Sequence, residues 1–262
     1  MAEYTTVRAG AGTRSAEIDQ GLRTHMNKVY GTMSVGMLIT ALAAWAIAGL
    51  SVTATLTQYP LGNGEYLTSL GYALYATPLK WVVMFLPLVM VFAFSAMINR
   101  MSAATAQLVF YIYAAAMGLS LSAIFLIFTG HSIVQVFLIT AIAFAGLSIY
   151  GYVTKRNLSG MGTFLMMGVI GLIGAMLVNV VLTMIYGQPF SGLQFAISVI
   201  GVLIFAGLTV YDTQKIKTTY LAHVAQGDAE WLGKAAIMGA LNLYLDFINM
   251  FMFLLQFLGN RE

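Results

Sequence analysis

The sequence has no cysteine and few charged residues, and both shortages exclude classes of function. Of its 262 residues 8% are Asp, Glu, Lys or Arg, whereas a soluble domain carries about 25%. The absence of cysteine excludes disulfides, cysteine-ligated zinc, iron–sulfur clusters and thiol nucleophiles. A soluble globular enzyme of ordinary composition is therefore excluded.

The motifs of common catalytic sites are missing as well. The three histidines, His25, His131 and His223, lie far apart and in predicted loops. There is no H-E-x-x-H zinc motif, no G-x-S-x-G nucleophile turn and no phosphate-binding Walker loop. We therefore predict that the protein is not an enzyme and carries no bound cofactor.

Long apolar runs dominate the chain. Hydrophobic residues make up 60% of it, and several runs reach about 20 residues, enough to cross a hydrocarbon core of ~30 Å. The runs are continuous rather than alternating, which argues against a β-barrel. We predict an all-α membrane protein with a polar cytosolic segment at 1–27 and a membrane domain at 28–259. The seven predicted transmembrane helices cover residues 29–50, 79–98, 103–128, 133–152, 163–186, 192–216 and 235–258.

The basic residues predict the orientation of these spans. The net charge of +3 comes from residues that flank the spans, so topology explains it better than nucleic-acid binding. The segments on the side of the N-terminus hold Arg8, Arg14, Arg23, Lys28, Arg100, Lys155, Arg156, Lys215, Lys217 and Lys234, and the other side holds Lys80 and Arg261. Cytosolic loops carry the excess of Lys and Arg, so we predict a cytoplasmic N-terminus and a C-terminus outside.

The last span contains a carboxylate near its middle. Asp246 has Asn242 four residues before it and Asn249 three residues after it, which places all three on one helix face. A charged side chain at this depth costs about 2.5–3.5 kcal/mol on insertion scales, so it rarely lies there without a partner or a path for water. The pattern favours a functional role over one in helix packing alone.

Asp212, at the inner end of the sixth span, allows two interpretations. It is a helix-end carboxylate paired with Lys215, or the helix continues through Lys217 and brings Asp212 toward Asp246. Two carboxylates in one site of low dielectric cannot both ionise cheaply, so such a pair tends to hold one proton. The pair would be a proton switch and, because its ligands are oxygens, a transient calcium site.

Arg100 is the predicted counter-charge for these carboxylates. It follows the second span at its cytosolic end, from which its side chain could bend inward. The alternative is an ordinary basic anchor at the membrane surface.

Three segments of the sequence resemble the transmembrane Bax inhibitor motif family. They are KVYGTM at 28–33, GLTVYDTQKIK at 207–217 and ALNLYLDFINMFMFLLQFLG at 240–259. The resemblance extends over nearly the whole chain from Gly21 onward and indicates a bacterial member in the inner membrane. It implies a seven-helix fold with the last helix at the centre.

The resemblance also implies a function. Family members are pH-sensitive calcium leaks with two sensor aspartates, which match Asp212 and Asp246, and an arginine that matches Arg100. The chain lacks the basic C-terminal tail of eukaryotic members and has no acidic residue in its second span. Some bacterial relatives restrain a membrane-bound ATP-dependent protease.

Two functions of different class follow as hypotheses. The first is a passive, pH-sensitive calcium leak gated by Asp212 and Asp246, with proton-coupled exchange as a variant. The second is a membrane-embedded modulator of an ATP-dependent protease that transports nothing. The expected partners are membrane lipid, calcium and protons, and in the second case a protease complex; we expect a monomer and no nucleic acid.

Overall fold

The computed structural model describes residues 3–61, 64–188 and 190–260, with side chains from Glu17 onward, and it is almost entirely helical. The α-helices in these residues are α1 (Glu3–Ser51), α2 (Ser69–Gly71), α3 (Leu79–Met97), α4 (Ala103–Leu121), α5 (Gly130–Val153), α6 (Ser159–Tyr186), α7 (Ser191–His223) and α8 (Ala229–Leu258). Single turns of 3-10 or π helix cover Tyr72–Ala76, Ile98–Arg100, Ser122–Leu126 and Val224–Gln226.

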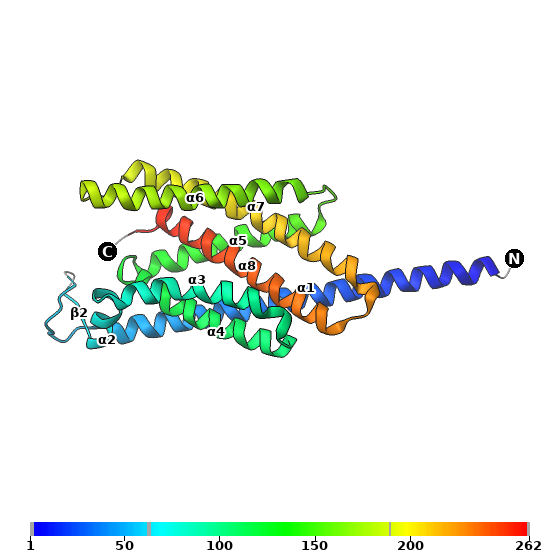
Figure 1. The fold of residues 1–262 in the computed structure, drawn as a ribbon, viewed down its shortest axis with the longest axis horizontal. Helices are drawn as coiled ribbons and strands as arrows, with labels where there is room; N and C mark the ends of the chain where they lie inside the picture. Colours follow the sequence, from blue (N-terminus) through cyan, green and yellow to red (C-terminus); the bar gives the residue numbers. More distant parts are fainter. Residues whose placement is uncertain (1–2, 62–63, 189, 261–262) are drawn as a thin grey trace.

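Seven helices in the described residues are long and apolar enough to cross a membrane, which confirms the predicted all-α membrane fold. They lie roughly along one direction, and the two chain termini are at opposite ends of the bundle (Figure 1). An odd number of crossings requires this arrangement, because each span reverses the side on which the chain emerges.

The end of the bundle away from the N-terminus carries the only strands in the described part of the chain. β1 (Val52–Thr53) pairs antiparallel with β2 (Tyr66–Leu67). The next residue, Thr68, donates its hydroxyl to the carbonyl of Leu50 over 2.9 Å. These bonds fasten the long connection between the first two spans to the end of α1.

Helix α8 lies at the centre of the bundle, as expected. In its most apolar stretch 67% of the residues are buried, against 11% for α6. It packs against α1, α4, α5 and α7, and in Figure 1 it runs between α6 and α7 on one side and α1, α3 and α4 on the other. The other helices shield α8 from lipid.

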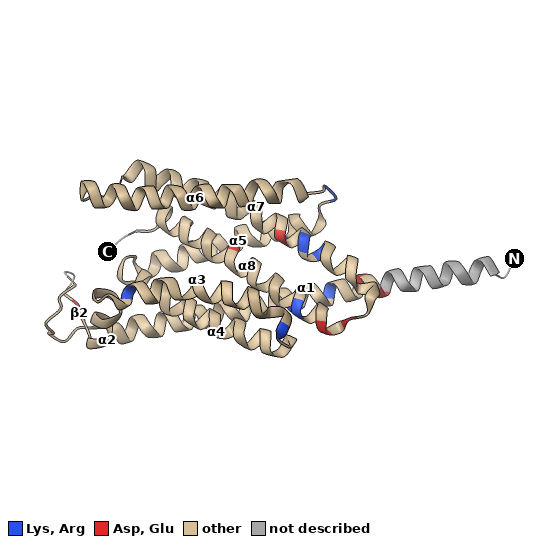
Figure 2. Cartoon of the chain, viewed as in Figure 1, with Lys and Arg blue, Asp and Glu red and all other residues tan. Residues whose placement is uncertain are grey.

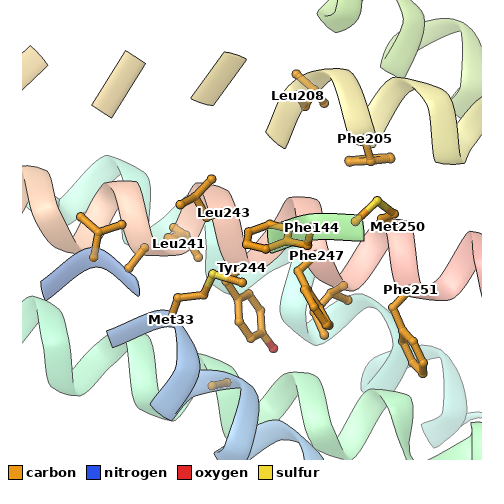
Figure 3. Close-up of a cluster of buried hydrophobic side chains, with 14 of the residues drawn as sticks. Met33, Phe144, Phe205, Leu208, Leu241, Leu243, Tyr244, Phe247, Met250 and Phe251 are labelled. Atoms are coloured by element: carbon orange, nitrogen blue, oxygen red, sulfur yellow. The ribbon is translucent and has the colours of Figure 1, made fainter. Parts of the chain in front are cut away.

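Aromatic packing and one polar contact fix α8 in this position. Figure 3 shows apolar side chains of α8, among them Tyr244 and Phe247, together with side chains from neighbouring helices such as Phe144 of α5. The hydroxyls of Tyr244 and Thr40 are 2.7 Å apart, and Thr40 donates to the carbonyl of Ala114 over 2.9 Å. Tyr244 therefore joins α8 to both α1 and α4, and the centres of the Phe110 and Tyr244 rings are 5.6 Å apart in a T-shaped arrangement.

Most lysines and arginines lie at the end of the bundle nearer the N-terminus (Figure 2). That end also includes the described part of the predicted polar segment, since α1 continues from it without a break. Leu22 and Met26 are buried there, and the His25 ring lies 4.8 Å from the Tyr220 ring of α7. The described part of this segment, residues 17–27, thus packs against the rest of the bundle.

Candidate functional site

The connection between α7 and α8 sets the relative position of the two predicted site helices. Gly227 has a φ of +71°, a conformation that glycine adopts without steric cost, and it turns the chain back after α7. Asp228 caps α8 by accepting a hydrogen bond from the Trp231 amide over 2.9 Å. Glu230 then accepts from the amide of Ala103, the first residue of α4, over 2.6 Å. The start of α8 is thereby fixed against two other helices.

Asp246 is enclosed by the bundle. Its side chain is 4% exposed, and within the described residues its buried Oδ2 has no hydrogen-bond partner. A polar oxygen in an apolar interior costs free energy unless it is hydrogen-bonded, and a charged oxygen costs more. This carboxylate is accordingly a place where a proton, a water molecule or a cation would bind favourably.

Asp212 lies well inside α7, because that helix continues six residues beyond Lys217, to His223. It is half-buried and close enough to Asp246 for the two carboxylates to interact electrostatically. At 1.5 Å per residue, Asp212 is about 17 Å from the end of α7 and Asp246 about 26 Å from the start of α8. Both aspartates thus lie several turns from the α7–α8 connection, and no hydrogen bond among the described residues joins them.

The predicted supporting residues divide between the two helices. Lys215 is exposed one turn beyond Asp212, interacts with it electrostatically, and has its Nζ 5.8 Å from the centre of the Tyr211 ring. Asn249 donates its side-chain amide to the carbonyl of Leu245 over 2.8 Å, so this contact is within its own helix. Asn242 is half-buried one turn before Asp246.

Arg100 is not brought to the aspartates. It is exposed at the end of the 3-10 turn Ile98–Arg100 and, in the part of the chain that the structure describes, forms no ion pair with a carboxylate. Its role as a counter-charge stays a prediction, and it requires a movement of this turn or of its side chain.

Two buried hydroxyls on the helices packed against α8 were not predicted from the sequence. Ser148 on α5 and Thr213 on α7 have side-chain oxygens without a hydrogen-bond partner among the described residues. One turn before Ser148, the Phe144 ring is 5.4 Å from the ring of Phe247, the residue after Asp246. Ser and Thr in membrane helices usually bond to their own backbone, so the sequence contains no signal that distinguishes these two.

A crevice of about 300 Å³ opens at the basic end of the bundle. Asn99, Lys215, Trp231 and Asn242 are among the residues that line it. Since Asn242 precedes Asp246 by one helical turn, the crevice reaches to within about 6 Å of the Asp246 level along the α8 axis. Neither Asp212 nor Asp246 is among the residues that line it.

No cluster of three or more His, Cys, Asp or Glu side chains is present in the described residues. Asp212 and Asp246 would therefore have to bind a cation without a third acidic or histidine ligand. Calcium takes six to eight oxygen ligands, of which two carboxylates would supply only a part.

The fold and this site define a polytopic helical membrane protein with a carboxylate at its centre. The sequence model of the family described as "Inhibitor of apoptosis-promoting Bax1" matches residues 22–262. The chain is 41% identical over 242 residues to the inner membrane protein YbhL of Escherichia coli K12, covering 92% of this chain and 94% of YbhL. It is 40% identical over 262 residues to the protein RP147 of Rickettsia prowazekii, with both chains covered completely.

The chain therefore belongs to the Bax inhibitor family. Its seven apolar helices and its similarity to YbhL make it a multi-pass protein of the inner membrane.

Proposed function

We propose that the protein is a passive, pH-sensitive cation leak of the inner membrane that prefers calcium, and that Asp212 and Asp246 are its sensor. One observation supports this above the others: a nearly fully buried carboxylate lies on the central helix within electrostatic range of a second carboxylate on the neighbouring helix. Calcium and protons are the transported or sensed species, and the proposal requires neither catalysis nor a cofactor.

The sensing step rests on the repulsion between two like charges in an apolar interior. The free energy of ionising one aspartate depends on whether the other already carries a charge. Protonation thus changes the repulsion between α7 and α8, which pack along much of their lengths. We propose that this change repositions the two helices and opens or closes the path through the crevice, with Arg100 as the group that engages a carboxylate in the closed form.

Efflux from calcium-loaded liposomes containing the purified protein tests this proposal. Asp246→Asn and Asp212→Asn each remove one ionisable group with little change in shape, so each should flatten the pH dependence of the efflux. Glu17→Gln removes an exposed carboxylate from α1 and should leave the pH profile unchanged. A wild-type profile in both aspartate variants would refute the sensor, and no efflux from the wild-type protein would favour the protease modulator.

We further propose that the basic end of the bundle faces the cytoplasm, with the N-terminus inside and the C-terminus outside. The distribution of Lys and Arg in Figure 2 supports this orientation, since cytoplasmic segments carry the excess of basic residues. A C-terminal alkaline phosphatase fusion should be active and a C-terminal green fluorescent protein fusion dark. The opposite pair of results would reverse the orientation.

A further inference from the structure

A large cleft separates α1 from α5. Both helices pack on α8 and α7, but they make no extensive contact with each other. The space between them has a volume of about 870 Å³, with Phe144 and Phe247 among the apolar side chains that line it. This is within the range of small-molecule sites, ~300–1,000 Å³, and the cleft opens sideways, past exposed Leu38 and Ile149.

The cleft has a polar, basic mouth. On α1 its lining begins at Arg23 and ends at Ala41, which at 1.5 Å per residue is about 27 Å. Arg23 is exposed and makes no ion pair in the described part of the chain. Opposite it, the carbonyl of Tyr152 on α5 accepts a hydrogen bond from Lys217 Nζ over 2.8 Å, so a second cation stands beside the mouth.

Inside the mouth the lining is mostly apolar, and it includes one buried hydroxyl without a partner among the described residues. Ser148 is 4% exposed and lines the cleft, and its hydroxyl has no partner among the described residues. A hydroxyl in this position can donate to an ester carbonyl located just below a lipid headgroup. The order from the mouth inward is therefore cation, hydroxyl, apolar wall, which matches the order of groups along a phospholipid.

We propose that the cleft is a binding site for one anionic phospholipid of the surrounding membrane. Its phosphate would lie at Arg23 and Lys217, and one acyl chain would occupy the apolar wall up to Ala41. An acyl chain spans one leaflet, about 15 Å of a ~30 Å core, so the cleft is long enough. Basic pockets between transmembrane helices bind anionic headgroups in this way. The proposal is independent of the transport function.

Native mass spectrometry of the delipidated full-length protein tests the site. Phosphatidylglycerol and phosphatidylcholine are the probes, added separately over a range of concentrations. Wild-type protein should retain one phosphatidylglycerol at least tenfold more tightly than one phosphatidylcholine. Equal retention of the two lipids would overturn the anionic headgroup assignment.

Two pairs of variants locate the bound lipid. Ala145→Phe fills the cleft, whereas Ala143→Phe adds the same volume to an exposed position of α5 that does not line it. Arg23→Gln removes the cation at the mouth, and Lys80→Gln removes one near the opposite end of the bundle. Ala145→Phe and Arg23→Gln should each weaken phosphatidylglycerol retention at least tenfold, and the controls should retain it. If the variant and its control weaken retention equally in each pair, the retained lipid is bound non-specifically around the protein, and the proposed site is overturned.

A second measurement does not depend on how the bundle tolerates Ala145→Phe. Because the chain has no cysteine, Ser34→Cys and Val35→Cys each provide one unique position for a fluorophore. Ser34 lines the cleft, while Val35 is 44% exposed outside it. A trace of acyl-chain nitroxide phosphatidylglycerol should quench the label at Ser34 more strongly than the label at Val35. Equal quenching would overturn the proposal.

Discussion

Helices α6 and α8 are similar in length and differ in what surrounds them. α6 has 28 residues and a mean hydropathy of 2.4 in its most apolar window, and α8 has 30 residues and 1.5. The less apolar helix is the buried one, with 67% of that window buried against 11% for α6. In a soluble protein the opposite order would be expected.

The difference shows which force places helices in a membrane. Lipid tails are as apolar as leucine, so apolar side chains gain no free energy from leaving lipid for protein. A carboxylate or hydroxyl does gain by leaving lipid, because only protein or enclosed water can bond to it. Asp246 and Tyr244 therefore require α8 to be enclosed, whereas the apolar side chains that make up most of α6 are well solvated by acyl chains.

The largest difference between the two helices is expected when an aromatic ring is removed from each and the losses of stability are compared. Phe253 of α8 is 6% exposed and stacks on Phe205, and Phe164 of α6 is 73% exposed. Phe253→Ala should lower the free energy of unfolding by about 3–5 kcal/mol because it leaves a cavity. Phe164→Ala should change it by less than about 0.5 kcal/mol. SDS titration in mixed micelles measures the free energy of unfolding of both variants. Equal losses would contradict the proposed difference between α6 and α8.

A smaller effect is expected from added volume at glycines. A Cβ at Gly239 of α8 would lie 2.9 Å from Cγ1 of Ile216, while a Cβ at Gly174 of α6 meets nothing within 4 Å. Gly239→Leu should therefore destabilise the protein by about 1–3 kcal/mol through overpacking. Gly174→Leu should be neutral or slightly stabilising. Thermal unfolding in detergent compares the two, and a neutral Gly239→Leu would show that α7 and α8 separate easily.

The smallest effect concerns a single hydroxyl. Tyr244→Phe removes the contact with Thr40 and should lower the free energy of unfolding by about 0.6 kcal/mol, the average for hydrogen bonds between membrane helices. Tyr186 of α6 is 65% exposed, and Tyr186→Phe is the matched control, with no expected loss. A double-mutant cycle with Thr40→Val isolates the pair. A coupling energy of zero would mean that packing of the Tyr244 ring, and not its hydroxyl, holds this residue in place.

Much of this fold could be predicted because crossing a membrane is a local property of the sequence. A run of about 20 apolar residues becomes a helix wherever its neighbours are, since only helical hydrogen bonding satisfies its backbone in lipid. For the same reason Asp246 could be singled out from one span alone. The central position of α8, in contrast, was expected from the family resemblance and not from hydropathy.

The candidate site could be predicted only in part, because it depends on where separate helices meet. The sequence left open whether Asp212 lies at the end of its helix or deeper inside it. The structure places it inside, because α7 continues to His223. Ser148 and Thr213 gave no signal, since their importance comes from unpaired oxygens beside another helix. Arg100 lies at the predicted end of its span and is exposed there, and whether such a side chain reaches a buried carboxylate depends on how separate helices pack.

By itself the sequence determined the number of spans, the uneven distribution of charge between the two ends, and the presence of two carboxylates in the last two spans. Hydrophobicity and charge act on each segment separately, so these features need no knowledge of neighbours. Only the tertiary structure decided which helix is enclosed, how deeply each aspartate is buried, and that α1 and α5 leave a cleft between them. Those features come from side-chain packing between distant segments. The hydropathy of a single segment carries no information about that packing.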